Sequence, residues 1–276
     1  MVSIDTAAVY EIEDEVGRAV ADAIAAGEVT RQDMFVVTKL WLRNFKRDQV
    51  VVALKASLSK LKMDYVDLYL THWPTPFKAT PTDTPVMDND LDIHTETWPG
   101  MEECVALGLA KSIGVSNYNH LQIYQLIKVA KIKPVVNQVE CHPFLAQRKL
   151  IDHCRKWGVV LTAYSPLGGS PIAEDRSNLS KDVRQGLFEN QVIKDLVKKH
   201  AGKSAGQILL KFQVQRGVIA IPKSVTKSRI AENAAIFDFQ LDDQDVAALE
   251  ALNQNARYVH AKDLQEHKNW PFAIEY

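Results

Sequence analysis

Three kinds of feature are scarce in this sequence of 276 residues, and each scarcity excludes a class of protein. The three cysteines, Cys104, Cys141 and Cys154, have the spacing of neither a disulfide framework nor a zinc site, which favours reduced thiols and a cytoplasmic location. No apolar run is long enough to span a membrane, and the first residues lack the basic and apolar stretches of a signal peptide. A net charge of −1 argues against nucleic acid or an anionic membrane as the main partner.

A glycine-rich dinucleotide fingerprint is also absent, because no Gly-x-Gly-x-x-Gly segment follows any expected strand, and this disfavours a Rossmann domain. The sequence instead alternates short β-rich runs with amphipathic helices and short connections. Such alternation favours right-handed crossovers and a parallel sheet. The length fits one α/β barrel, so we expect a single domain over residues 1–276 with a parallel (β/α)8 TIM-type barrel fold.

Seven strands are expected, over residues 2–5, 34–38, 65–70, 111–115, 134–137, 159–164 and 218–221. The spacing of apolar residues predicts helices over residues 11–26, 49–61, 98–107, 121–130, 147–157 and 204–215, and Gly158 suits the C-terminal cap of a helix. Two long irregular stretches, 74–96 and 168–189, follow strands, and loops of this length are usually functional. Because a closed barrel of this type has eight strands, we expect an N-terminally truncated barrel in which the strand before Val2 is missing.

Four polar residues lie at the ends of three consecutive strands: Asp5, Tyr10, Lys39 and His72. In a parallel barrel this end of the strands carries the active site. Lys39, held by Asp5, could lower the pKa of Tyr10 from its ordinary value of about 10, and His72 could orient a substrate carbonyl. Tyr10 could then protonate the carbonyl oxygen while a cofactor delivers hydride. Each residue alone is more often a packed or solvated group, but the four together indicate a proton-donating site.

A basic segment follows the last expected strand and opens a helix, with Lys223, Ser224, Thr226 and Arg229 close together. Phosphate sites of barrels favour the loops after the last two strands and a helix N-terminus. Arginine offers a planar fork and lysine a point charge to a phosphate. The two hydroxyls beside the two cations favour a phosphate, and so NADP over NAD, although a basic helix start that faces water is the alternative.

His142, in the segment Glu140-Cys141-His142-Pro143, has a spacing that fits no standard zinc site. We interpret it as structural, and no metal is expected.

Several ordered motifs run the length of the chain: Asp5-Thr6-Ala7-Ala8-Val9-Tyr10 with Glu13 and Val16-Gly17, Thr38-Lys39-Leu40-Trp41, Thr71-His72-Trp73-Pro74, Met101 to Tyr118, Asn137 to Pro143, Ala163 to Gly168, and Ile221-Pro222-Lys223-Ser224 with Arg229 and Glu232-Asn233. Together they resemble the aldo-keto reductase family, and more closely its aldose and aldehyde reductase branch. The resemblance covers the chain from Ile4 to Tyr276, and several long motifs in order are far more specific than a single glycine pattern.

The resemblance implies a monomeric, NADP(H)-dependent oxidoreductase that reduces aldehydes or ketones to alcohols. It implies that Tyr10 is the proton donor and that Asp5, Lys39 and His72 are its partners. The cofactor residues that it implies are Ser116, Asn117 and Gln138 at the nicotinamide carboxamide, Tyr164 stacked on the nicotinamide, Ser165 and Leu167 at the pyrophosphate, Lys223, Ser224, Thr226 and Arg229 around the 2′-phosphate, and Glu232 and Asn233 at the adenine. Trp41 and Trp73 would wall the pocket of a small carbonyl substrate, which the C-terminal tail from Ala256 to Lys268 would help to shape.

The sequence departs from the family at its N-terminus, where the family's hairpin, first strand and first helix have no counterpart. A unit of this kind corresponds to roughly 30 to 40 residues. Either the sequence is an incomplete gene model, which we favour, or it is a natural short form that could be unstable, partner-dependent or inactive. The alternative function is therefore a non-catalytic NADP-binding or interaction protein. A barrel isomerase or hydrolase would need paired carboxylates or metal ligands at the strand ends, which we do not find.

Overall fold

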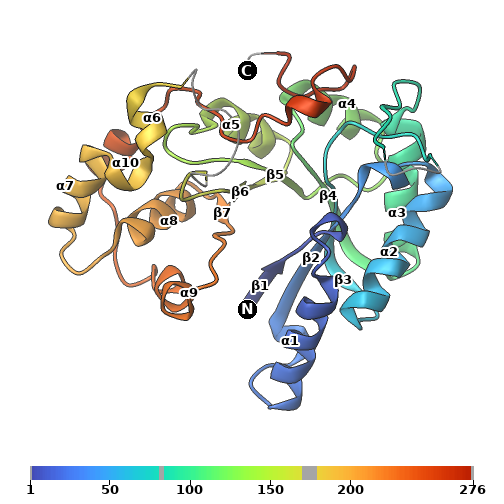
Figure 1. Cartoon of the computed structure of the whole chain (residues 1–276), viewed down its shortest axis with the longest axis horizontal. Coiled ribbons are helices and arrows are strands. Elements are labelled where there is room, and N and C mark those ends of the chain that lie inside the picture. Colours follow the sequence, from blue (N-terminus) through green and yellow to red (C-terminus); the bar gives the residue numbers. More distant parts are fainter. Residues whose placement is uncertain (1, 81–83, 170–178, 275–276) are drawn as a thin grey trace. The chain divides into compact units, whose positions relative to one another are not determined.

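The structure, a computed structural model, describes residues 2–80, 84–169 and 179–274, so parts of both long irregular stretches lie outside the described residues. The chain divides into two compact units, Met1–Asn137 with Asp263–Tyr276, and Gln138–Lys262. Seven strands follow one another in the order β1-β2-β3-β4-β5-β6-β7, and each overlaps a predicted strand (Figure 1). They are β1 (Val2–Asp5), β2 (Met34–Leu40), β3 (Val66–Thr71), β4 (Ala110–Ser116), β5 (Val136–Glu140), β6 (Val160–Tyr164) and β7 (Ile219–Ala220). The expectation of one domain stays a prediction.

The first unit is built on the parallel strands β1 to β4. Its helices are α1 (Glu13–Ala25), α2 (Arg47–Leu61), α3 (Trp98–Ala106) and α4 (His120–Val129), with short helical turns η1 (Ala8–Tyr10), η2 (Arg31–Asp33), η3 (Leu42–Asn44) and η4 (Ile93–Thr97). All six residues of β3 and six of the seven in β2 are buried. Strands covered on both faces read as continuous apolar runs, which is why both were recognisable in the sequence.

The strand register brings the ends of β1, β2 and β3 to one level. Asp5 pairs with Val37, and Lys39 pairs with Leu70. The backbone amide of His72 donates to the Leu40 carbonyl at 3.2 Å, which continues the alignment one residue beyond β3. Polar residues at these positions therefore share one end of the sheet.

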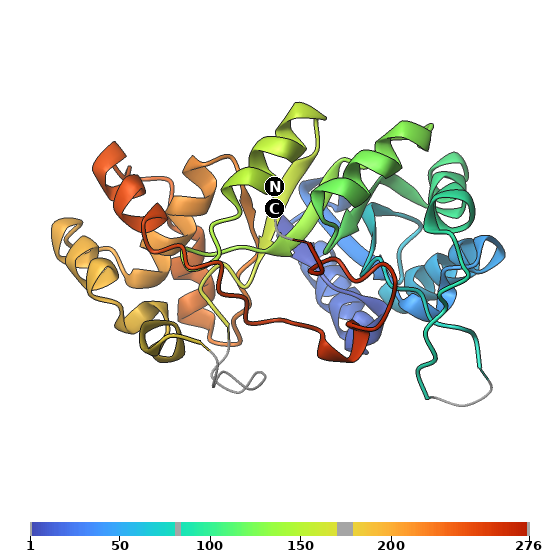
Figure 2. The same ribbon diagram turned by 90° about the horizontal axis from the view of Figure 1, so that it is seen from above.

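The connection between β3 and α3 is an extended loop, seen in Figure 2. Its two arms meet in an antiparallel bridge between Phe77 and Met87, and the Lys78 amide donates to the Val86 carbonyl at 2.7 Å. The π-helical turn η4 then leads into α3. Among the described residues, no helix combines the length and apolar character that a membrane span requires.

The second unit contains β6 and β7, which pair in parallel, and helices that pack into a core around Phe144, Ile208, Phe212 and Leu249. Its helices are α5 (Arg148–Lys156), α6 (Lys181–Gln185), α7 (Gln191–Lys199), α8 (Ala205–Gln215), α9 (Lys227–Ala234) and α10 (Asp243–Glu250), with η5 (Leu187–Glu189) and, at the unit boundary, η6 (Lys262–Leu264). Gly158 follows α5 with a φ of 73°, as the predicted helix cap requires.

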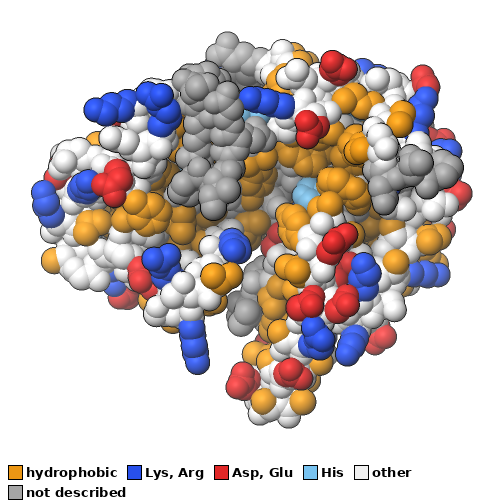
Figure 3. All heavy atoms as spheres, viewed as in Figure 1, with side chains coloured by type: hydrophobic (Ala, Val, Ile, Leu, Met, Phe, Trp, Pro, Cys, Tyr) orange, Lys and Arg blue, Asp and Glu red, His pale blue; other side chains and the backbone are white. Residues whose placement is uncertain are grey.

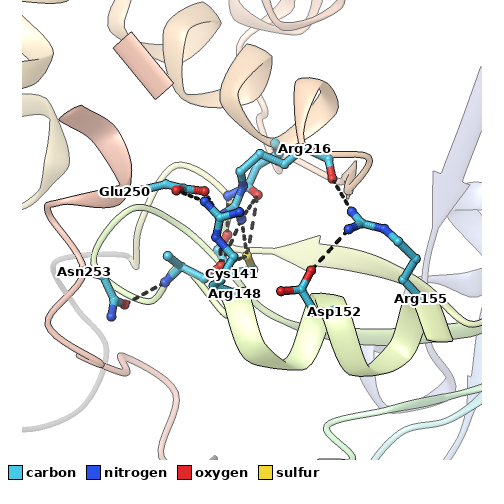
Figure 4. A network of polar contacts seen from close by, with 9 residues as sticks. Cys141, Arg148, Asp152, Arg155, Arg216, Glu250 and Asn253 are labelled. Atoms are coloured by element: carbon cyan, nitrogen blue, oxygen red, sulfur yellow. Dashed lines mark hydrogen bonds and ion pairs between the residues drawn. The ribbon is translucent and has the colours of Figure 1, made fainter. Parts of the chain in front are cut away.

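Arg216, directly after α8, joins three segments of the second unit (Figure 4). Its guanidinium donates to the Ala146 carbonyl at 3.0 Å, lies 3.4 Å from the sulfur of Cys141 and 3.6 Å from the Glu250 carboxylate. Its carbon atom Cζ lies 4.2 Å from the centre of the Phe212 ring. Since a buried guanidinium needs acceptors, this side chain holds the loop after β5 against α8 and α10.

Helix α1 approaches α2 closely at Gly17. A Cβ atom at this position would lie 2.5 Å from the Leu61 carbonyl oxygen and 2.8 Å from the Leu61 Cα atom. Elsewhere on and beside α1, hydrophobic side chains reach the surface, with Ile12 47% and Ile24 38% exposed (Figure 3). The glycine contact is therefore a main packing contact of this helix.

Replacing Gly17 with alanine is expected to lower the free energy of unfolding by about 1–3 kcal/mol, because the methyl group forces the two backbones apart. Urea unfolding followed by circular dichroism measures this. Gly206→Ala in α8 is the matched control, because its Cβ would meet only Asn233 Oδ1 at 3.5 Å and Ser204 Oγ at 3.7 Å. Equal destabilisation by both substitutions would contradict the role given to the close contact.

Candidate active site

The centre of the site is a buried ion pair between Lys39 on β2 and Asp5 at the end of β1. Lys39 is 1% exposed, and its Nζ also donates to the Thr6 carbonyl at 3.0 Å. Burial lowers the pKa of the Lys39 amino group, and the Asp5 carboxylate opposes that shift. The pair thus holds a positive charge where little water reaches it.

Tyr10 lies over this pair, because η1 turns the chain back after β1. Its ring centre is 5.2 Å from the Lys39 Nζ, and its ring meets the His72 ring edge to face at 5.6 Å between centroids. No described residue forms a hydrogen bond with the Tyr10 hydroxyl, and 45% of the residue surface is exposed. The hydroxyl can therefore serve an incoming ligand.

Burial and then the Asp5 charge raise the pKa of Tyr10 to about 12. This differs from the expectation that Lys39 lowers it, because Asp5 pairs with the ammonium and cancels much of its field at the ring. Solvent screens part of the effect, since almost half of the tyrosine surface is exposed. Tyr10 consequently holds its proton at neutral pH.

His72 follows β3 and is 8% exposed. Its Nδ1 is buried without a hydrogen-bond partner among the described residues. Burial, and next the charge of Lys39, lower the pKa of His72 to about 3. The ring is therefore neutral at physiological pH and can donate one N–H.

Aromatic rings surround this group. Trp41 lies 5.4 Å from His72 and 6.5 Å from Phe77, measured between ring centroids. Trp73 meets Phe272 at 5.9 Å, and Phe272 meets Trp270 at 5.5 Å. Trp41 and Trp73 were predicted from the sequence, whereas Phe77, Trp270 and Phe272 were not. Their one sequence signal, aromatic residues beside prolines outside regular elements, is weak.

Two of the predicted cofactor residues, Ser116 and Asn117, end β4 in the same unit and are buried. Asn117 has a φ of 63°, and its Nδ2 donates to the His72 carbonyl at 3.0 Å and to Ser116 Oγ at 3.2 Å. The structure thus connects these two residues to the backbone of His72.

The remaining predicted cofactor residues lie in the second unit, at strand ends or after them. Gln138 is buried in β5, Tyr164 ends β6, Ser165 has a φ of 49°, and Leu167 packs on the core. Lys223, Ser224 and Thr226 lie after β7, and Arg229, Glu232 and Asn233 lie on α9.

The start of α9 has the donors that a phosphate needs. Lys223 and Arg229 are exposed and form no ion pair within the described chain. Thr226, at the N-cap position, makes no side-chain cap, so amides of the first turn are free of that bond. Two free cations at a helix N-terminus fit an anionic group.

His142 is fully buried, with its Nε2 at 2.8 Å from the Glu140 carboxylate, which also accepts from the Tyr258 amide at 2.7 Å. Burial raises the pKa of Glu140, but the His142 hydrogen bond and the Arg257 charge outweigh it, so that this pKa is lowered. These contacts fit a structural role. No group of three or more metal-ligating residues occurs in residues 2–80, 84–169 and 179–274.

Parallel strands in chain order, each followed by a helix, with polar residues at the strand ends, define a β/α-barrel protein with its site in the barrel position. The family model described as "Aldo/keto reductase family" matches residues 2–254. The chain belongs to this family of oxidoreductases.

Similar proteins agree with this membership. Aldo-keto reductase AKR2E4 of Bombyx mori is 45% identical over 268 residues, which cover 97% of this chain and 83% of that protein. Aldo-keto reductase family 1 member C4 of Homo sapiens is 43% identical and covers 99% of this chain and 85% of its own length.

Two crystal structures are also similar. That of the Bombyx mori AKR2E4 in complex with NADP gives a TM-score of 0.88 at 45% identity and covers 98% of this chain and 84% of its own. That of the aldo-keto reductase AKR2E5 complexed with NADPH gives 0.89 at 39% identity and covers 99% and 80%. The predicted fold class, a parallel β/α barrel with seven strands present, is confirmed.

The low pKa of His72 has a measurable consequence. The ring signals of His72 in ¹H–¹³C NMR, assigned with His72→Asn, are expected not to titrate between about pH 8 and about pH 5. Unfolding exposes the ring and returns its pKa to about 6.5, so its contribution to stability is lost as the pH falls from about 6.5 to about 3. A titration midpoint near 6.5 in the folded protein would contradict the buried, neutral ring.

Proposed function

We propose that this protein reduces aldehydes and ketones to alcohols with NADPH as the hydride donor. The observation that carries the proposal is the position of Tyr10, between the buried Lys39–Asp5 pair and the neutral His72 ring. Membership in an oxidoreductase family supports the reaction class.

The four residues divide the work of protonation. NADPH supplies hydride to the carbonyl carbon when it is bound. His72, neutral and surrounded by aromatic rings, donates its N–H to the carbonyl oxygen and orients the substrate. Tyr10 then transfers its phenolic proton to that oxygen.

Loss of this proton leaves a phenolate on Tyr10. The Lys39 ammonium stabilises that negative charge across the short distance to the ring, and Asp5 keeps the lysine in place. Because 45% of Tyr10 is exposed, water can return the proton after the alcohol leaves. The aromatic residues Trp41, Trp73 and Phe77 favour an apolar or aromatic substrate.

The residues expected at the cofactor suit NADP(H) in each unit. Ser116 and Asn117 offer buried amide and hydroxyl groups for a carboxamide. At α9, Lys223 and Arg229 offer two cations without acidic partners in the described chain, which suits a 2′-phosphate. Gln138, Tyr164, Ser165, Leu167, Ser224, Thr226, Glu232 and Asn233 would complete the contacts.

Tyr10→Phe is expected to lower kcat by about 10²–10⁴-fold in the reduction of 4-nitrobenzaldehyde while NADPH binding is retained, because only the transferable proton is removed. Absorbance of NADPH measures turnover, and fluorescence titration measures binding.

Tyr124→Phe on α4 is the control, since it removes the same hydroxyl elsewhere. Full activity of the Tyr10 variant would refute the proton-donor role. NADPH binding without turnover by the unchanged chain would favour the non-catalytic alternative.

Arg229→Met is expected to weaken NADPH binding roughly tenfold to hundredfold and to leave NADH binding nearly unchanged, because a charged hydrogen bond to the extra phosphate is lost. Both dissociation constants come from fluorescence titration. Lys227→Met removes one positive charge from the same helix and is expected to affect both cofactors little. Equal losses for NADPH and NADH would contradict the phosphate contact.

A further inference from the structure

The N-terminal cap of α4 carries more hydrogen bonds than capping requires. Asn119 Oδ1 accepts from the Gln122 amide at 3.0 Å, and Gln122 Oε1 accepts from the Asn119 amide at 3.0 Å, which is a complete capping box. Both side chains cap with their oxygens alone. Their NH2 groups are left for other partners.

Those NH2 groups hold the C-terminal tail. Asn119 Nδ2 donates to the Pro271 carbonyl at 3.0 Å, and Gln122 Nε2 donates to the Asn269 carbonyl at 2.8 Å. Figure 1 shows the tail, in red, beside α4. Two side chains thus fix the backbone on both sides of Trp270.

Other capping boxes of this chain show that the amides are not needed for the helix. Helix α10 is capped by the carboxylates of Asp242 and Asp245. Helix α8 is capped by Ser204 and Gln207, and Gln207 likewise uses its Nε2 to hold a distant backbone carbonyl, that of Ala235, at 2.7 Å. An amide in a capping box of this chain therefore accompanies a second contact.

The segment held in this way carries the aromatic wall. Trp270 and Phe272 pack edge to face, and Phe272 packs on Trp73, the residue after His72. On its other side the tail contacts the loop after β3, where His267 Nε2 lies 3.1 Å from the Asp88 carbonyl and the Lys268 amide donates to Asn89 Oδ1 at 2.9 Å. The tail is docked at both ends of residues 267–272.

The same loop also reaches the candidate active site. Asn117 donates to the His72 carbonyl, and Asn119, two residues later, donates to the tail. The loop after β4 therefore ties the backbone of His72 and the aromatic tail to one rigid helix start.

We propose that Asn119 and Gln122 are positioning residues that hold Trp270 and Phe272 against Trp73, and that this wall sets the preference for large aromatic carbonyl substrates over small ones. The selectivity part rests on the proposed function, whereas the docking of the tail does not. Neither residue touches the reacting atoms in this role.

The test is the double substitution Asn119→Asp with Gln122→Glu. It keeps both capping oxygens, and negative charge at a helix N-terminus is favourable, so α4 is retained. It removes both NH2 donors and places carboxylates against the carbonyls of Asn269 and Pro271. Asn119→Ser, which caps without added charge, separates loss of the donor from charge repulsion.

Two readouts are made on the full chain. Hydrogen exchange of residues 267–274 is expected to accelerate in the double variant. The KM for 4-nitrobenzaldehyde is expected to rise about tenfold, and kcat and the KM for propanal are expected to stay within about twofold. Asn190→Asp at the N-cap of α7, an equal change away from the tail, is expected to alter neither readout.

A tail that stays protected in the double variant would overturn the docking role. A released tail with equal changes for both aldehydes would overturn the selectivity role. If the unchanged chain reduces neither aldehyde, the proposed function and the selectivity role fail together, and the exchange result still decides whether Asn119 and Gln122 hold the tail.

Discussion

The candidate site depends on one buried charge, the ammonium of Lys39. An isolated ion in this position would cost several kcal/mol, so its burial requires the Asp5 carboxylate and the Thr6 carbonyl. This requirement ties the end of β1 to β2 in one register. The same ion pair sets the protonation of its neighbours, since Lys39 helps keep His72 neutral and Asp5 helps keep Tyr10 protonated. A proton donor and a neutral hydrogen-bond donor follow from a single electrostatic constraint.

Much of the fold could be predicted because its strands are buried on both faces, as β2 and β3 show. All seven strands and the six predicted helices occur, with ends that shift by a few residues. The helices α6, α7 and α10 were not predicted. They have five to nine residues and depend on capping groups such as Asn190 and Asp242, which leave a weaker pattern than a long apolar stripe.

The site could be predicted in its members more than in its physics. Asp5, Tyr10, Lys39 and His72 were recognisable because they end or follow neighbouring strands, and the structure brings them together. The direction of the Tyr10 pKa could not be read from residue types, since it depends on whether Asp5 or Lys39 dominates at the ring. Nor could the contact of Asn119 with Pro271, because the two residues lie 152 positions apart and only the folded chain brings them together.

The groups placed around the carbonyl and those placed around the 2′-phosphate come from different stretches of the chain. Asp5, Tyr10, Lys39 and His72 belong to the first three strands, whereas Lys223 and Arg229 belong to the segment at α9, which contributes no buried residue to the core. Substitutions in α9 therefore carry little folding cost and leave the proton-donating residues untouched. Evolution can retune the choice of nucleotide in such a protein while its acid–base chemistry stays the same.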